Sequence, residues 1–213
     1  MTKNLHSQEY EIEATMAPNK KCPSCDSTEV RIEQPREFNY DRIGLSGVSL
    51  AGNGVTIFNC NNCKNKTTVI RQEQQLTQVI GISILVNGPG ITGEQVRYLR
   101  TLFGSTQKDF ADAIGKRRPT IAEWEAKGIK PVFGKPFDEI GLRLFLMHQF
   151  TDKVLESDYC FLSVQQEKEF SDFAGSFVEN LQKILDKNKR PKKITINRPR
   201  RSQNWQTVQC LSG

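Results

Sequence analysis

Apolar residues in the middle of the chain recur at helical spacing. Val96, Leu99 and Phe103 form one stripe, which predicts a helix over about 93–103 with Thr92 as its N-cap. A second set of positions follows at intervals of four, four, six and three: Gln107, Ala111, Gly115, Ile121 and Trp124.

This second set predicts a helix-turn-helix. Ala111 and Ile121 let two helices cross closely, Gly115 supplies the positive φ of the turn between them, and Trp124 closes the small core. The helix ends carry matching signals: Ser105 or Thr106 as the first N-cap, Asp109 in the first turn, Pro119 in the first turn of the second helix and Gly128 at its end.

Alternating apolar and polar residues in the N-terminal part predict short strands. Residues 29–38 and 55–58 alternate in this way, and the glycine-rich residues 44–54 between them are predicted to form a long turn. The β-branched run Val79–Val86 ends at a turn signature over 87–90. We therefore expect a strand there rather than a loose hinge.

Two further helices are expected beyond residue 134. Apolar residues crowd nearly every face of 137–155, so this helix must be buried. A second stripe has the spacing of a paired helix and runs through Phe170, Phe173, Phe177, Leu181 and Ile184. Either this helix folds back onto the first one within the chain, or two chains pair along it.

Two Cys-x-x-Cys pairs predict a metal site, formed by Cys22, Cys25, Cys60 and Cys63. Four thiolates fill the tetrahedral shell of one Zn²⁺ per chain, and a filled shell makes the ion structural, because a catalytic zinc keeps an open position. Disulfides or a redox motif would not explain two copies in a chain without an export signal. Cys160 and Cys210 have no such partner and are expected to be unligated.

Composition and charge add information mainly about the two ends of the chain. The 213 residues are 25% charged and 37% hydrophobic, as in proteins with buried cores. Residues 183–201 contain nine Lys or Arg and one Asp, and the whole chain has a net charge of +6. We expect residues 187–213 to be a basic, disordered tail that either contacts DNA phosphates or only aids solubility.

Residues 1–20 show no periodicity and are expected to form a flexible leader. They contain no apolar export signal, and the longest apolar run is too short to span a membrane. We therefore expect a cytoplasmic protein with no membrane partner.

The region 104–128 is similar to the helix-turn-helix of phage repressors and of many bacterial antitoxins. In the phage repressors, an Arg and a Glu at the positions of Arg100 and Glu125 form an internal ion pair; two solvated charges are the alternative. The similarity implies a homodimer on a double-stranded DNA operator. The candidate DNA-binding residues are Thr106, Gln107, Lys116, Arg117, Arg118, Thr120 and Glu123.

A four-cysteine region followed by such a helix-turn-helix resembles the MqsA family of antitoxins. The resemblance is carried by Cys22-Pro-Ser-Cys25, Cys60-Asn-Asn-Cys63 and the residues from Thr106 to Gly128. It implies that the zinc domain binds and neutralises a partner toxin, an RNA-cleaving protein. It also implies that the helix-turn-helix dimerises and represses the operon that encodes both proteins.

The sequence departs from that family at the residues that read DNA. The family's base-reading Asn and Arg align with Pro119 and Glu123, so Arg117, Arg118 and Thr120 are the candidates to replace them. An Arg is suited to bidentate contact with guanine, and a Glu can accept a hydrogen bond from cytosine. Residues 134–213 also exceed the family pattern.

The sequence thus predicts an α+β protein. The expected parts are a small zinc-bound sheet domain (21–75), a linker (76–90), an all-α helix-turn-helix domain (91–133) and C-terminal helices that are candidates for dimerisation (134–186). The expected function is that of a sequence-specific repressor and type II antitoxin. The alternative is a phage or stress-operon repressor with a purely structural zinc domain and no toxin. An enzyme is not expected, because the sequence contains no catalytic residue set or open metal site.

Overall fold

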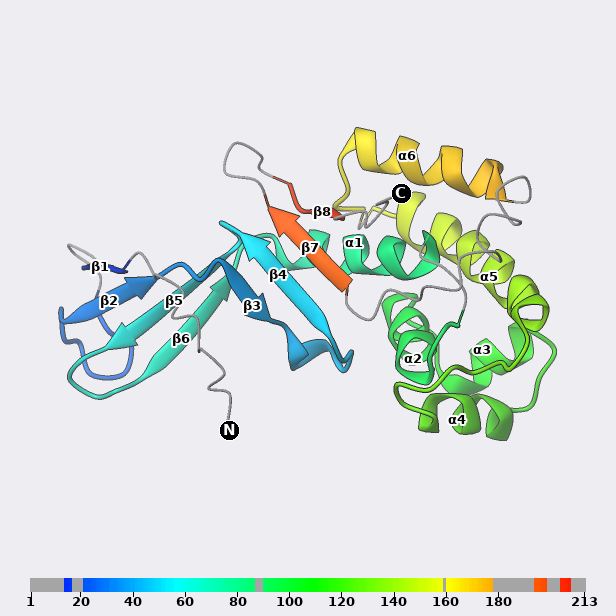
Figure 1. Ribbon diagram of the computed structural model, residues 1–213, viewed down its shortest axis with the longest axis horizontal. Coiled ribbons are helices and arrows are strands. Elements are labelled where there is room, and N and C mark those ends of the chain that lie inside the picture. Colours follow the sequence, from blue (N-terminus) through cyan, green and yellow to red (C-terminus); the bar gives the residue numbers. More distant parts are fainter. Residues whose placement is uncertain are drawn as a thin grey trace, which may run out of the picture.

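The structure, a computed structural model, describes residues 14–16, 21–86, 90–158, 160–177, 194–198 and 204–207. Two small sheets lie at one end of the molecule and the helices at the other, with helix α1 (Glu73–Val86) between them (Figure 1). This arrangement confirms the predicted α+β class with an N-terminal sheet region and C-terminal helices.

The first sheet contains β1 (Ala14–Met16), β2 (Val30–Glu33), β5 (Val55–Cys60) and β6 (Lys66–Ile70), in that order and with antiparallel neighbours. The predicted strand over 29–38 is split into β2 and β3 around Pro35, which has no N–H to donate to a sheet. β1 lies inside the predicted flexible leader, so that prediction is wrong for these three residues. The other leader residues before Lys21 lie outside the described part.

The second sheet joins the two ends of the chain. Its strands are β3 (Glu37–Asn39), β4 (Val48–Gly52), β7 (Ile194–Arg198) and β8 (Gln206–Thr207), in that order. β4 and β7 are parallel, and the other neighbours are antiparallel.

This sheet corrects two predictions. Residues 44–54 do not form one long turn, because β4 occupies their middle after the short 3₁₀ helix η1 (Asp41–Ile43). The tail over 187–213 is not disordered throughout, because Ile194, Ile196 and Trp205 are buried against distant parts of the chain. Those apolar residues are few and separated by polar ones, so the local composition could not predict that they are buried. The remaining tail residues lie outside the described part.

The prediction of a strand in a linker over 76–90 is wrong, because this segment lies mainly in α1, a helix of 14 residues. Nearly every residue from Gln75 to Leu85 is buried, so periodicity could not separate a buried strand from a buried helix. The sequence did contain one indication of a helix: Glu73 and Gln74, which precede the apolar run, have high helix propensity.

Helices α2 (Gly93–Leu102), α3 (Gln107–Ala113) and α4 (Arg118–Ala126) begin and end where the sequence predicted. Thr92 forms a capping box with Gln95, and Thr106 forms one with Asp109. Gly115 and Gly128 have φ values of 64° and 58°, the left-handed conformation that glycine adopts without a Cβ clash. These caps set the lengths of the three helices.

The chain continues into α5 (Pro136–Phe150), a single π turn η2 (Thr151–Leu155) and α6 (Val164–Gly175). The rings of Phe150 and Phe170 lie 4.8 Å apart between centroids, and both side chains are buried. The aromatic stripe of α6 therefore folds back onto α5 within the chain, which was one of the two open alternatives. Leu181 and Ile184 lie outside the described residues.

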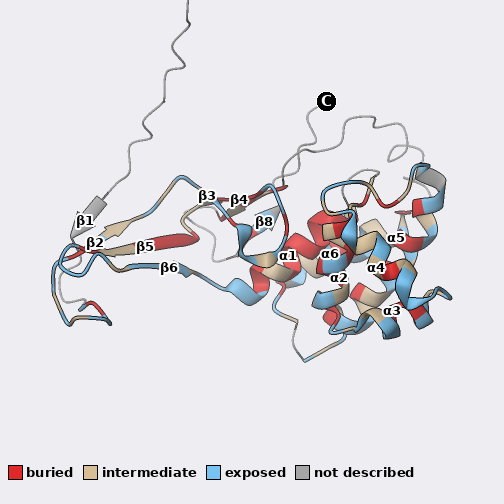
Figure 2. Cartoon of the chain, turned by 90° about the horizontal axis from the view of Figure 1, so that it is seen from below, coloured by how far each residue is buried: buried red, intermediate tan, exposed pale blue. Residues whose placement is uncertain are grey.

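The larger of two hydrophobic clusters runs from the second sheet and the start of β5 through α1 to the remaining helices, and a small separate cluster lies around Cys22, Val30 and Cys60. Buried residues concentrate on α1 and on the part of β5 that approaches it (Figure 2). A buried ion pair, with Arg143 Nε 2.6 Å from Glu139 Oε1, ties α5 to this core. Arg143 also donates to the carbonyls of Ile84 and Leu85 at the end of α1. Among the described residues, no helix combines the length and apolar character needed to cross a membrane.

Candidate DNA-binding and metal sites

The packing of α4 against α2 and α3 fixes the helix-turn-helix. Ala111 and Ile121 are fully buried at the crossing, and the rings of Trp124 and Phe133 meet edge to face with centroids 5.1 Å apart. A Cβ on Gly93 would lie 2.3 Å from the carbonyl oxygen of Trp124, so a glycine is needed for this close approach of α2 to α4. The helix that carries the candidate base-reading residues is therefore rigidly held.

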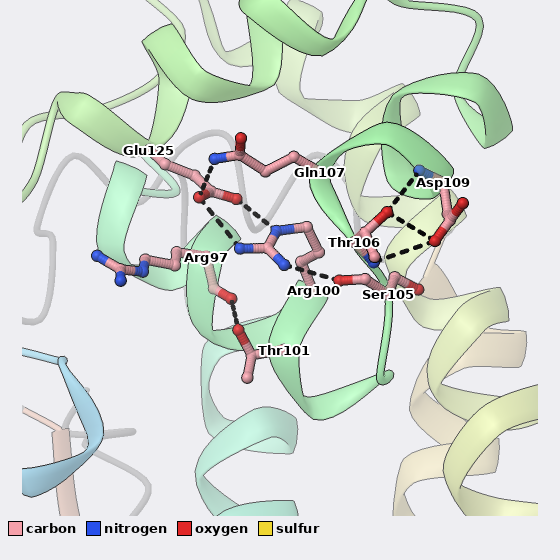
Figure 3. A network of polar contacts seen from close by, with 8 residues as sticks. All are labelled: Arg97, Arg100, Thr101, Ser105, Thr106, Gln107, Asp109 and Glu125. Carbon is pink, nitrogen blue, oxygen red and sulfur yellow. Dashed lines mark hydrogen bonds and ion pairs between the residues drawn. The ribbon is translucent and has the colours of Figure 1, made fainter.

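Arg100 and Glu125 form the predicted ion pair, with Arg100 Nε 2.6 Å from Glu125 Oε1 (Figure 3). Their side chains are 14% and 7% exposed, so the alternative of two solvated charges is wrong. Arg100 Nη2 also donates to Glu125 Oε2 at 3.2 Å, and Nη1 donates to the carbonyl of Ser105 at 2.7 Å. The pair joins α2 to the last turn of α4.

Gln107, at the start of α3, belongs to the same network. Its amide nitrogen donates to Glu125 Oε2 at 2.8 Å. Burial raises the pKa of Glu125, but hydrogen bonds from Arg100 and Gln107 outweigh it and lower this pKa below its ordinary value. Glu125 is thus held as a carboxylate, and it positions two side chains at the base of the candidate DNA surface.

The candidate contact residues gather around the start of α4. Lys116, Arg117 and Arg118 are exposed, and Pro119 occupies the first turn, where its missing N–H is not needed. Glu123 is also exposed, whereas Thr120 is half-buried. The structure thus places three cations together where the helix would enter a groove.

Thr106 and Gln107 lie beside an open hollow of about 560 Å³ between the end of α2 and the starts of α3 and α4. Lys108 and Arg118 also line this hollow. Lys108 was missed in the sequence, although its position directly after the first residue of α3 was a usable signal. The hollow has the cationic lining expected of a site for a DNA phosphate.

The four predicted metal ligands come together at one end of the first sheet. Their sulfur atoms all lie within 4.8 Å of one another, and the Cys22–Cys63 and Cys25–Cys60 pairs are each 3.6 Å apart. Tetrahedral coordination with Zn–S bonds of about 2.3 Å separates sulfurs by about 3.8 Å, whereas a disulfide requires about 2.05 Å. The four cysteines therefore fit a single metal ion such as zinc.

The backbone around the two pairs is nearly the same. Asp26 and Lys64, the residues after each second cysteine, have φ values of 56° and 60°. Each turn closes when the N–H of Asp26 or Lys64 donates to the carbonyl of Cys22 or Cys60, at 2.9 and 3.0 Å. The two turns are joined by Asn65, whose amide donates to Ser24 Oγ at 2.9 Å. Two matching turns thus hold the thiols together.

Hydrogen bonds to sulfur favour the thiolate at two positions. The backbone of Ser24 lowers the pKa of Cys22, and the backbone of Cys63 lowers the pKa of Cys60 to about 6. The backbone of Asn65 lowers the pKa of Cys63 too, but the thiol of Cys25, burial and the other neighbouring thiols outweigh it and raise that pKa to about 12. All four cysteines can therefore be thiolates at once only when a bound cation offsets their negative charges.

The remaining cysteines stand apart from this cluster. The thiol of Cys160 donates to Glu167 Oε1 at 3.5 Å, and burial raises the pKa of this thiol. Cys210 lies outside the described residues.

Comparison with known protein families supports the assignment of the central region. Residues 96–131 match the family model described as "Helix-turn-helix". Neither a curated protein nor a solved structure matches the chain significantly. The matched region covers most of α2, all of α3 and α4 and the turns between them, and it contains the ion pair and the exposed cations. The chain therefore contains a repressor-type helix-turn-helix, which indicates a DNA-binding transcriptional regulator.

Proposed function

We propose that this protein is a cytoplasmic transcriptional repressor that binds a two-fold operator as a homodimer. The observation that carries the proposal is the helix-turn-helix itself, in which a nearly buried ion pair holds α4 while three cations at its start remain exposed. A recognition helix must combine a fixed position with accessible side chains, because base contacts depend on register.

The exposed residues divide into two roles. Arg117, Arg118, Thr120 and Glu123 lie on or beside the first turns of α4 and are the proposed base readers, with an Arg suited to guanine. Thr106, Gln107 and Lys116 are the proposed phosphate contacts, which set the register without reading sequence. Lys108, in the hollow beside Thr106, joins this second group.

We propose that the four cysteines bind one structural Zn²⁺ per chain. The sulfur separations and the paired turns support this proposal, and four thiolates leave no open coordination position for a catalytic water. The proposed function accordingly includes no enzymatic step.

The antitoxin role is the more specific part of the proposal. It is supported by the order of a four-cysteine sheet and a repressor-type helix-turn-helix, the order that resembles the MqsA antitoxins. In this role the cysteine-bearing sheet binds a toxin, and the repressor controls the operon for both. Co-expression of the protein with its genomic neighbour tests this role, since a specific complex should co-purify and suppress the neighbour's toxicity.

A repressor with a purely structural zinc domain is the second candidate. One observation favours it: the start of β5 and α1 share a single hydrophobic core with the helix-turn-helix. A sheet built into that core stabilises the DNA-binding unit whether or not it binds a partner. If DNA binding is intact and no neighbour binds or is neutralised, this candidate replaces the antitoxin role.

Selection of bound sites from fragmented genomic DNA tests the repressor function itself. The full chain should enrich a sequence with two-fold symmetry, with half-sites one helical turn or a small multiple apart. Enrichment of asymmetric or unrelated sequences would contradict it.

A further inference from the structure

The two described pieces of the C-terminal segment return to the N-terminal half of the molecule. β7 lies between β4 and β8, and it pairs with β4 along five residues, from Val48 opposite Ile194 to Gly52 opposite Arg198. In Figure 1, β7 lies beside β4 and close to α1. A strand from the C-terminal end therefore completes the interior of a sheet begun near the N-terminus.

Trp205 is fully buried next to this strand, and hydrogen bonds hold it on several sides. Its indole Nε1 donates to the carbonyl of Arg71 at 2.7 Å, and its backbone N–H donates to Gln75 Oε1 at 3.0 Å. Its carbonyl accepts from Gln166 Nε2 at 2.6 Å. One residue thus joins the turn before α1, the first part of α1 and α6.

The turn between β4 and β5 has the shape needed to admit the indole. A Cβ on Gly54 would lie 2.0 Å from Trp205 Cη2, and a Cβ on Gly52 would lie 2.2 Å from the carbonyl oxygen of Arg198. No side chain larger than hydrogen fits at Gly54 while Trp205 keeps its position. The two remote segments are therefore sterically matched.

All these contacts meet at the junction between the cysteine-bearing sheet and the helices. β5 leads from Gly54 to Cys60, and β6 leads through Arg71 and Gln72 into α1. Gln72 Oε1 accepts a hydrogen bond from Arg198 Nη2 at 3.1 Å. The C-terminal segment thus contacts two of the three chain crossings of this junction, those from β4 to β5 and from β6 to α1.

A separate contact ties the second sheet to the helix-turn-helix. Glu94, in the first turn of α2, accepts hydrogen bonds from the N–H of Ser46 at 2.8 Å and from its hydroxyl at 3.1 Å. Ser46 lies in the loop that precedes β4. The sheet that β7 completes is therefore also bonded to the DNA-binding unit.

We propose that the C-terminal segment, β7 together with Trp205, is a positioning clasp. It fixes the orientation of the cysteine-bearing sheet relative to the helix-turn-helix. When it is released, the sheet keeps its own fold but swings about the turn at Arg71 and Gln72. This inference goes beyond the proposed repressor and antitoxin functions and does not depend on DNA binding or on a toxin.

Limited trypsin digestion of the full chain tests the clasp at its hinge. Trypsin cleaves after Arg71, whose carbonyl is bonded to Trp205, and after the exposed Lys64 in the second cysteine turn. Trp205→Ala and Gly54→Ala should each speed cleavage after Arg71 by about tenfold or more, because cleavage follows the population of the open form. Cleavage after Lys64 should keep its rate.

Two controls and a milder variant make the result decisive. Gly134→Ala adds a methyl group where nothing lies within 4 Å and should change neither rate. Gln166→Ala removes the hydrogen bond to the Trp205 carbonyl, together with the capping bonds of Ser163 at the start of α6, and leaves the indole in place, so it gives a milder variant if the stronger ones fold poorly. Hydrogen exchange in α2, α3 and α4 should stay at the wild-type level. An unchanged rate after Arg71, or parallel increases at Lys64 and throughout these helices, would overturn the clasp.

Discussion

The ion pair between Arg100 and Glu125 gives the most quantitative prediction. Replacing Arg100 by Met removes two hydrogen bonds to Glu125 and one to the carbonyl of Ser105. Glu125 then remains as a carboxylate only 7% exposed, with its bond from Gln107. Removing one partner of a buried pair costs about 3 to 5 kcal/mol, and of an exposed pair under about 1 kcal/mol. Because this pair is nearly buried, we expect a cost of about 3 kcal/mol.

Thermal unfolding of the full chain measures this cost. For a protein of this length, about 3 kcal/mol lowers Tm by about 6 to 12 °C. Arg97→Met, one turn earlier in α2, is the matched control: Arg97 is exposed, so its replacement should lower Tm by under about 3 °C. In the double variant Arg100→Met with Glu125→Gln, the stranded charge is gone, so the combined loss should be smaller than the sum.

A double-mutant cycle therefore expresses the result as a coupling energy, which we expect to be about 2 kcal/mol. If the two single effects add within about 0.5 kcal/mol, or if Arg97→Met costs as much as Arg100→Met, the ion pair does not hold α4. Contacts other than this ion pair would then fix the recognition helix.

Three further predictions test the rest of the account. Because the pKa of Glu125 is lowered in the folded protein, this carboxylate stabilises the fold fully above its ordinary pKa of 4.5, and its contribution is lost as the pH falls further. Glu125→Gln should therefore reduce the loss of unfolding free energy at acid pH, measured by urea titrations at several pH values. An unchanged loss would contradict this prediction. Cys22→Ser should lower the zinc content from about one to near zero per chain by elemental analysis and open residues 21–70 to hydrogen exchange, whereas retained metal would exclude the four-cysteine site. Neutralising the basic cluster of the tail, Lys187, Lys189, Arg190, Lys192 and Lys193, should weaken binding to operator and to random DNA equally and reduce the salt slope of binding. A selective loss of operator binding would instead assign base reading to this cluster.

Local signals were enough to predict the helix-turn-helix. Thr92, Thr106, Gly115 and Gly128 act within a few residues of their own position, as caps or as turn glycines, so their effects can be recognised without a tertiary structure. The cysteine cluster was predictable for a related reason, because each Cys-x-x-Cys pair encodes its own turn. The ion pair between Arg100 and Glu125 followed from the resemblance to phage repressors.

The errors occurred where structure depends on distant contacts. The run Val79–Val86 is β-branched and locally suggests a strand, but burial on all sides makes it part of α1. Trp205 lies in a polar segment, and its burial depends on Gly54 and Arg71, far away in the sequence. A single sequence contains no signal that pairs such positions. Sequence patterns therefore located the candidate sites but not the segment that orients them.

We propose that α4 reads an operator through the cations at its start. The most direct test of this proposal is the ratio of affinities for the selected operator and for a random duplex at one salt concentration, by fluorescence anisotropy. In the variant with Arg117→Ala and Arg118→Ala the ratio should fall to near one, while Lys153→Ala with Lys168→Ala, an equal loss of exposed charge on the C-terminal helices, should preserve it. A preserved ratio in the arginine variant would show that α4 is not the reading helix.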